Sequence, residues 1–324
     1  MKIVQCVPNF SEGKDKEKIE RIVCTLKYKE GFKLVNYEPD PNYNRTVVTL
    51  IGDLYAIKNA LIPFVEVIES EIDMNLHKGE HLRMGALDVL PFVPINDVTM
   101  DECIEVSKEI GREIGEKFNI PVYLYEESAT SPDRINLANI RKGEFEGLSK
   151  KMEDPLWKPD YGPNEPHNTF GAIAIGARNP LIAFNIDLDT ENVEIANTIS
   201  RYIRNLNGGY RFVKAAGVKL YDRNICQVTM NITDYKKTAM YRVFQTVKFE
   251  ALRYGIDVKA CELIGLVPLD TLLLSLEYYC NCSGINIKAF ELKENYSFKV
   301  IIEQLEKCMG LYGFNETKII EYYI

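Results

Sequence analysis

Apolar residues in the first half of the chain alternate between helical and strand-like spacing. Helical spacing predicts amphipathic helices over residues 15–29 and 53–72, and a third helix from residue 99. Asp53 can cap the second helix, and Pro63 kinks or splits it. Runs typical of strands occupy residues 2–8, 32–37, 45–51, 87–95 and 121–125.

The second half of the chain repeats the same alternation. Ser297 and Gly310 are placed to begin and end an outer helix over residues 298–309. Strands are expected at 181–187, 212–221, 225–232 and 258–266, with helices at 190–206 and 237–254.

The order of these elements predicts the architecture. The second half reads β-α-β-β-α-β, the split βαβ order of ferredoxin-like sandwiches, and the first half has this order plus an extra α-β. We therefore expect an α+β fold of two ferredoxin-like subdomains, residues 1–178 and 179–324, packed side by side. The junction between them is a natural substrate cleft.

A long segment rich in Pro and Gly, residues 126–180, separates the two halves. Long ordered loops in compact proteins tend to be functional. This segment holds Trp157, Tyr161 and Phe170, whose rings can stack on a flat heterocycle. The alternative is a loop fixed in place by one buried Trp.

Charge and cysteine usage exclude several classes of protein. The 324 residues carry 39 Lys and Arg against 47 Asp and Glu, a net charge of −8, which argues against a nucleic-acid partner. No apolar run approaches the roughly 20 residues of a membrane span, and no secretory signal is present. Eight scattered cysteines without a Cys-x-x-Cys pair are typical of reduced thiols. We expect a cytoplasmic protein with no membrane or nucleic-acid partner.

The segment from residue 77 to residue 86 carries the most informative chemistry and allows two interpretations. The His-x-x-Glu-His pattern of His77, Glu80 and His81 resembles that of zinc hydrolases, where both histidines bind the metal from one helix face. Gly79 and Gly85 disfavour such a helix. Alternatively, His81 in a glycine-flanked loop transfers protons as a general acid and base. We favour proton transfer, with no metal, and regard His77 as a supporting residue.

A second polar cluster lies between two expected strands. Glu38, Asp40 and Arg45 can clamp a polar substrate, because Arg binds carboxylates in a bidentate manner. The alternative is a polar turn shaped by Pro and Asn.

Five motifs in order resemble the glutamate formimidoyltransferase family, which includes the N-terminal half of formimidoyltransferase–cyclodeaminase. The resemblance runs from residue 6 to about residue 268, and the chain resembles a stand-alone transferase. The motifs are CVPNFSEG at 6–13, NRTV at 44–47, HKGEH at 77–81, GALDV at 85–89 and GLVP at 265–268. Relatives usually have Pro after the catalytic His, where this chain has Leu82.

This resemblance implies a homodimer of two ferredoxin-like subdomains with a tetrahydrofolate tunnel between them. It implies transfer of a formimino group from N-formimidoyl-L-glutamate to N5 of tetrahydrofolate, in histidine degradation and one-carbon metabolism. His81 corresponds to the catalytic histidine and shuttles the proton. Glu38 or Asp40 is the acid that stabilises the cationic amidine. Arg45, Arg83 and Arg178 are the candidates for binding substrate carboxylates.

The family's folate loop falls on ten consecutive residues of the long central segment. They are Gly162, Pro163, Asn164, Glu165, Pro166, His167, Asn168, Thr169, Phe170 and Gly171. The residues leave three alternatives open: formyl transfer between 5-formyltetrahydrofolate and glutamate on the same site, a zinc hydrolase, and a folate carrier without turnover.

Overall fold

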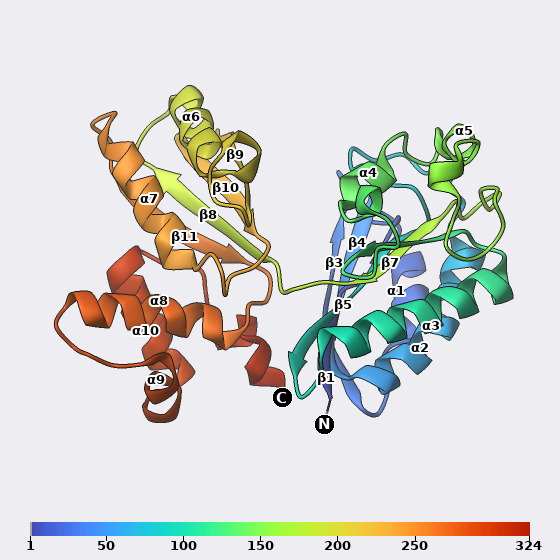
Figure 1. Cartoon of the computed structure of the whole chain (residues 1–324), viewed down its shortest axis with the longest axis horizontal. Helices are drawn as coiled ribbons and strands as arrows, with labels where there is room; N and C mark the ends of the chain where they lie inside the picture. Colours follow the sequence, from blue (N-terminus) through green and yellow to red (C-terminus); the bar gives the residue numbers. More distant parts are fainter. Residues whose placement is uncertain (1) are drawn as a thin grey trace. The chain divides into compact units, whose positions relative to one another are not determined.

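The computed structural model describes residues 2–324 and divides into two compact units, the first ending at Arg178 and the second running from Asn179 to Ile324 (Figure 1). Both units combine helices with a β-sheet, so the expected α+β class is confirmed. Among the described residues, no helix is long and apolar enough to cross a bilayer.

The first unit is built on a seven-stranded sheet in which β1 and β2 lie end to end between β4 and β5. Strands β3, β4, β1 and β5 pair antiparallel in that order, and β7 and β6 extend the sheet with parallel pairing. The strands are β1 (Ile3–Cys6), β2 (Asn9–Phe10), β3 (Phe32–Asp40), β4 (Arg45–Asp53), β5 (Leu87–Asn96), β6 (Val122–Glu126) and β7 (Ile173–Ala177).

Three capped helices cover one face of this sheet: α1 (Lys16–Cys24), α2 (Leu54–Glu71) and α3 (Met100–Phe118). Asp15 and Asp53 cap the first two, and Thr99 forms a capping box with Glu102 at the third. Helix α2 continues through Pro63 without splitting. Pro63 is exposed, so water can bind the carbonyl group that the missing N–H leaves unpaired.

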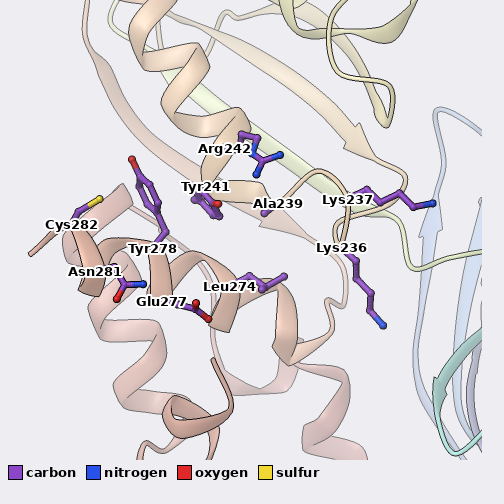
Figure 2. A pocket seen from close by; sticks show the side chains of 10 residues that line it. All are labelled: Lys236, Lys237, Ala239, Tyr241, Arg242, Leu274, Glu277, Tyr278, Asn281 and Cys282. Carbon is purple, nitrogen blue, oxygen red and sulfur yellow. The ribbon is translucent and has the colours of Figure 1, made fainter. Parts of the chain in front are cut away.

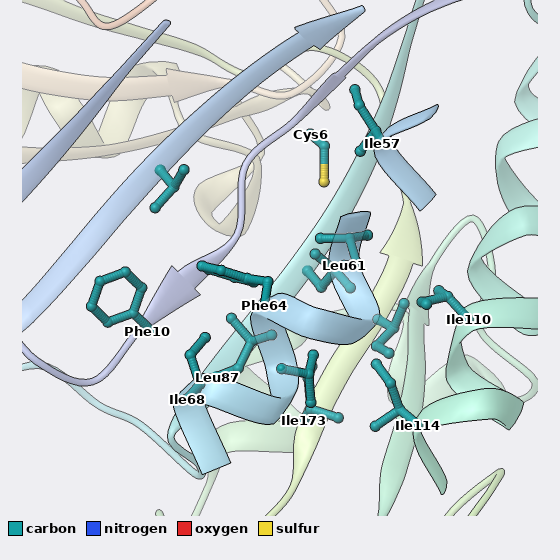
Figure 3. Packing of buried hydrophobic residues seen from close by; sticks show 14 of the residues in the cluster. Cys6, Phe10, Ile57, Leu61, Phe64, Ile68, Leu87, Ile110, Ile114 and Ile173 are labelled. Atoms are coloured by element: carbon teal, nitrogen blue, oxygen red, sulfur yellow. The ribbon is translucent and has the colours of Figure 1, made fainter. Parts of the chain in front are cut away.

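The helices and the sheet enclose one hydrophobic core (Figure 3). Phe10 from β2 meets Phe64 from α2 edge to face, with 6.2 Å between ring centroids. A smaller cluster on the opposite face lies over β5, β7 and β6. The long central segment supplies it through α4 (Leu137–Arg141), α5 (Leu148–Met152) and the 3₁₀ turn at Pro155–Trp157.

Strand β7 is an element that the sequence did not predict, because residues 126–180 were expected to form a loop. The strand pairs in parallel with both β5 and β6. All five of its residues are buried, including Gly176. A short strand that is buried on both faces shows no alternation of polar and apolar residues, so periodicity does not reveal it.

The second unit carries a four-stranded antiparallel sheet in the order β11-β8-β10-β9. Helices α6 (Val193–Ile203) and α7 (Met240–Leu252) pack in its core. The strands are β8 (Ile182–Leu188), β9 (Val213–Leu220), β10 (Ile225–Ile232) and β11 (Val258–Ile264). This order of strands along the chain and across the sheet is the one that β1, β3, β4 and β5 follow in the first unit.

Three helices complete the second unit: α8 (Leu269–Cys282), α9 (Ala289–Asn295) and α10 (Phe298–Met309). The sequence predicted α10, which Ser297 caps and Gly310 ends. It did not predict α8 or α9. Helix α8 begins without a cap from its own sequence; instead the N–H of Leu269 donates to Glu321 Oε2 at 2.7 Å, a residue near the end of the chain.

Candidate functional site

The turn between β3 and β4 packs against the segment of residues 77–81. Asp40 Oδ1 shapes the turn by accepting from the backbone N–H groups of Asn42 and Tyr43, at 2.9 and 3.0 Å. Asn44 Nδ2 then donates to the carbonyl oxygen of Lys78 at 3.0 Å. At Gly79 the two backbones are so close that a Cβ would lie 2.2 Å from the carbonyl oxygen of Tyr43.

The residues that follow this segment, 84–86, pair with the end of the proposed folate loop. The N–H of Ala86 donates to the carbonyl oxygen of Phe170 at 2.8 Å, and that of Ala172 donates to Met84 at 3.1 Å. These bonds bridge Gly85 and Gly171. The structure therefore places the loop of residues 162–171 beside the segment that carries His81.

The imidazole of His81 faces a guanidinium group. Arg45, from the start of β4, donates through Nη1 to the ring of His81 and through Nη2 to Asn9 Oδ1 on β2. The ring of Tyr43 approaches edge-on, with centroids 5.7 Å apart. Both ring nitrogens face Arg45 Nη1. Because Arg only donates, this contact favours the neutral imidazole, which keeps a lone pair, over the imidazolium.

The surroundings keep His81 in this neutral state. Burial lowers the pKa of His81 to about 4, and the positive charges of Arg45 and Arg141 add to this effect. The charge of Asp88 acts in the opposite direction. A neutral imidazole is the form that accepts a proton, so His81 is prepared to act as a base.

Asp88 and Arg141 belong to the site, although the sequence did not single them out. Asp88 is 1% exposed; its Oδ2 accepts from Arg141 Nη2 at 2.5 Å and its Oδ1 from the N–H of Met84 at 2.9 Å. Arg141 is at the end of α4, in the segment expected to be a loop. Burial and the charge of Arg141 lower the pKa of Arg45 to about 10. Asn9 and Asp88 were seen only as parts of family motifs.

Every side-chain nitrogen of Arg83 and His77 makes a hydrogen bond within the protein. Nε of Arg83 donates to His77 Nδ1 at 3.3 Å, Nη1 donates to Glu144 and Glu146, and Nη2 donates to Glu146 and the carbonyl oxygen of His77. All five N–H groups of this guanidinium are thus used. His77 Nε2 donates to the carbonyl oxygen of Asn44 at 2.7 Å. Both residues hold the segment in place and leave no donor for a substrate.

The zinc interpretation lacks its geometric basis. Residues 77–81 do not form a helix, so His77 and His81 do not share a helix face. Both nitrogens of His77 take part in protein hydrogen bonds. Across residues 2–324, no group of three or more His, Cys, Asp or Glu side chains is arranged to hold a metal ion.

The two candidate acids differ in their surroundings. Asp40 lies opposite Arg45 in the β3–β4 register, and its charge acts on the pKa of Arg45. Glu38 is exposed and accepts from Asn36 Nδ2 at 2.8 Å. The structure thus places Asp40 beside Arg45 and Glu38 farther along the strand.

Arg178 follows β7, where its N–H donates to the carbonyl oxygen of Phe92 at 3.0 Å. Its charge opposes the burial that raises the pKa of Tyr125 on β6, and the charge of Arg141 acts on Tyr125 in the same way. Arg178 therefore interacts with Tyr125. The charge of Arg141 lowers the pKa of both Tyr125 and His81.

The loop of residues 162–171 is tightly folded. His167 and Gly171 exchange two backbone hydrogen bonds of 3.0 and 2.9 Å, and His167 Nδ1 accepts from the N–H of Phe170. The ring of Phe170 is fully buried in the core and is unavailable for stacking on a ligand. The ring of Trp157 is faced by Lys151 Nζ at 3.9 Å from its centroid.

A cavity of about 490 Å³ on the second unit contains none of the residues predicted for the site (Figure 2). It lies between α7 and α8, where the rings of Tyr241 and Tyr278 stack at 4.2 Å. The side chains of Lys236, Lys237 and Arg242 line it as well.

Comparison with known proteins decides the family. A model of the formiminotransferase domain, N-terminal subdomain, matches residues 3–178, and a model of the formiminotransferase domain matches residues 183–324. The chain belongs to the formiminotransferase family. The match extends over both units.

Two curated relatives of this formiminotransferase are named glutamate formimidoyltransferase. Glutamate formimidoyltransferase of Streptococcus pyogenes is 49% identical over 86% of this chain and 93% of its own length. The protein of the same name from Thermoplasma acidophilum is 42% identical over 88% of this chain and 95% of its own. The resemblance inferred from the motifs is confirmed, and the chain is a transferase.

Bifunctional relatives match over the whole chain. Formimidoyltransferase-cyclodeaminase of Dictyostelium discoideum is 37% identical over 100% of this formiminotransferase, which spans 60% of that protein. A structural alignment with the periplasmic protease PqqL from Escherichia coli covers 94% of this chain. Its TM-score of 0.18 at 7% identity does not indicate a shared fold.

Proposed function

We propose that this chain transfers the formimidoyl group of N-formimidoyl-L-glutamate to N5 of tetrahydrofolate, giving 5-formimidoyltetrahydrofolate and L-glutamate. Two relatives at 49% and 42% identity are named for this transferase activity. The observation that carries the chemistry is the neutral imidazole of His81, which is held by Arg45 in a half-buried site.

In this proposal His81 moves one proton between two nitrogens. N5 of tetrahydrofolate attacks the amidine carbon, and a C–N bond forms. When Arg45 turns to a substrate carboxylate, it frees the lone pair of the His81 ring. His81 then accepts the proton that N5 loses and returns it to the glutamate nitrogen, whose bond to the carbon breaks. One residue thus performs base and acid catalysis in sequence, a contribution of roughly 10²–10⁴ in rate.

Neighbouring charges orient the cationic donor. Asp40 is the proposed acid that stabilises the amidinium, since its charge already acts on Arg45 in the same turn. Arg45 and Arg178 are proposed to bind substrate carboxylates. The loop of residues 162–171 is proposed to contact folate through its backbone and exposed side chains. No metal takes part in these steps.

The quaternary and domain arrangement is part of the proposal. Residues 1–178 and 179–324 are proposed to be ferredoxin-like subdomains that bind tetrahydrofolate in a tunnel between them, in a cytoplasmic homodimer. What supports the subdomain assignment is the common strand order, β3-β4-β1-β5 in one sheet and β9-β10-β8-β11 in the other.

The decisive experiment compares His81→Ala with Glu80→Gln. We expect His81→Ala to lose 10²-fold or more in turnover with N-formimidoyl-L-glutamate and tetrahydrofolate, while folate binding survives. Glu80→Gln should retain turnover, whereas a zinc hydrolase would lose its general base. Full activity of His81→Ala would overturn the assignment.

A formyl donor tests the substrate. We expect 5-formyltetrahydrofolate with glutamate to react far more slowly than the formimidoyl pair under matched conditions. A faster formyl reaction would move the proposal to formyl transfer on the same residues. Binding of tetrahydrofolate without any turnover would support a folate carrier instead.

A further inference from the structure

Arg45 carries a positive charge into the site without an acidic partner in contact. Its guanidinium donates to His81 and to Asn9, both of which are neutral. Within residues 2–324, no ion pair involves Arg45. A half-buried guanidinium paired only with neutral groups is costly unless an anion completes its surroundings.

Arg141 brings a second positive charge to the same place. Its side chain is 13% exposed, and Asp88 holds it through Nη2 alone. Asp88, which holds Arg141, also binds the backbone of Met84, three residues after His81, and the charge of Arg141 acts on both His81 and Arg45.

Both arginines have an unused donor. The Nε–H groups of Arg45 and Arg141 are buried and have no hydrogen-bond partner in the protein. Buried donors in native structures are nearly always paired, with protein, ordered water or ligand. Two such donors on positively charged groups of one site call for an anionic acceptor, and a carboxylate fits the planar N–H pattern of Arg.

We propose that Arg141 and Arg45 together form a carboxylate-binding subsite beside His81, and that it takes a carboxylate of the glutamate part of the formimidoyl donor. This inference rests on the proposed function, because that function defines the donor. Asp88 orients Arg141 for this task. Arg83, whose five donors are used within the protein, has no part in it.

The alternative role for Arg141 is structural, since its pair with Asp88 ties α4 to β5. The two roles differ in what they predict for a donor without carboxylates. Formamidine carries the same transferable group as N-formimidoyl-L-glutamate but no carboxylate. A binding role affects the glutamate donor alone, whereas a structural role affects both donors.

The test uses Arg141→Met, with Lys142→Met as a matched control that removes an adjacent exposed positive charge. We expect Arg141→Met to raise KM for N-formimidoyl-L-glutamate about 10- to 100-fold, the loss of charged hydrogen bonds. Turnover with formamidine should fall far less than turnover with N-formimidoyl-L-glutamate, and Lys142→Met should behave as wild type with both donors. An equal loss with both donors, or an unchanged KM, would overturn the proposal.

Calorimetric titration with L-glutamate separates this proposal from the proposed function. Wild type and Lys142→Met should bind glutamate with equal affinity, and Arg141→Met should bind it about 10- to 100-fold more weakly. A wild-type protein that binds glutamate through Arg141 but does not transfer the formimidoyl group would refute the function and keep the subsite. Equal glutamate binding by wild type and Arg141→Met would refute the subsite.

Discussion

At His81, the partner of the imidazole is a guanidinium, not a carboxylate. A carboxylate would favour the protonated ring and raise its pKa, whereas Arg45 favours the neutral ring. Burial is the larger cause of the lowered pKa, and Arg141 acts in the same direction against Asp88. The site therefore presents a base that is free of its proton at neutral pH.

The first prediction concerns the titration of His81. Because its pKa in the folded protein is lowered to about 4, its NMR resonance should remain that of the neutral ring from pH 8 down to about pH 5. Unfolded His81 takes up its proton near pH 6.5, so the folded state loses stability as pH falls from about 6.5 to about 4.

Asp88→Asn serves as the control for this titration. Asp88 raises the pKa of His81, so removal of its charge should lower that pKa further. The His81→Ala variant identifies the resonance among the three histidines. A midpoint near 6.5 for His81 in the wild-type protein would contradict the prediction.

At the scale of elements, the site depends on close contact between two segments that are far apart in the chain. Strands β3 and β4 were predicted as strand-like runs at residues 32–37 and 45–51, and the structure confirms them. The contact of their turn with Gly79 was not predicted, because spacing along one segment says nothing about which other backbone approaches it. That contact positions the segment that carries His81.

The second prediction follows from this contact. Gly79→Ala adds a Cβ that would lie 2.2 Å from the carbonyl oxygen of Tyr43, so the segment must move away from the turn. We expect at least a tenfold loss in kcat/KM, because small displacements of catalytic groups are costly. Thermal stability should fall by about 1–3 kcal/mol at most, the usual cost of overpacking.

Leu76→Ala is the matched variant for Gly79→Ala. Leu76 is 80% exposed and lies three residues earlier, so its truncation leaves the backbone contact intact. We expect its kinetic constants to equal those of wild type. Wild-type activity in Gly79→Ala would show that the contact does not position His81.

Two missed elements have a common explanation. Strand β7 is buried on both faces, and α8 takes its cap from Glu321 rather than from a residue beside it. Elements that are stabilised by distant parts of the chain leave weak local signals. Helix α10, with its own cap at Ser297 and its own stop at Gly310, was predicted correctly.

At the scale of the whole molecule, each unit has its own hydrophobic core. The core of the first unit joins its sheet to α1, α2 and α3, and that of the second unit joins its sheet to α6, α7, α8 and α10. His81, Arg45, Asp88 and Arg141 all belong to the first unit. The net charge of −8 is a property of the entire chain and does not describe this locally cationic site.

The third prediction is that residues 179–324 fold when produced alone. Their core is complete within the unit, so we expect one cooperative thermal transition with retained helical and sheet signals in circular dichroism. This fragment should have no transferase activity, because His81 is absent from it. The matched fragment of residues 1–178 should also unfold cooperatively. Non-cooperative unfolding of both fragments would show that the cores depend on each other.

The sequence by itself determined the family, the α+β class, most helices and strands, and His81 as the residue to examine. These properties depend on local spacing and on motifs that lie within short segments. The tertiary structure decided which charged groups meet at His81. It paired Arg83 with Glu144 and Glu146, and it brought Arg141 from a segment expected to be a loop. These contacts join residues that are 50 or more positions apart in the sequence. Local spacing of residue types cannot predict them.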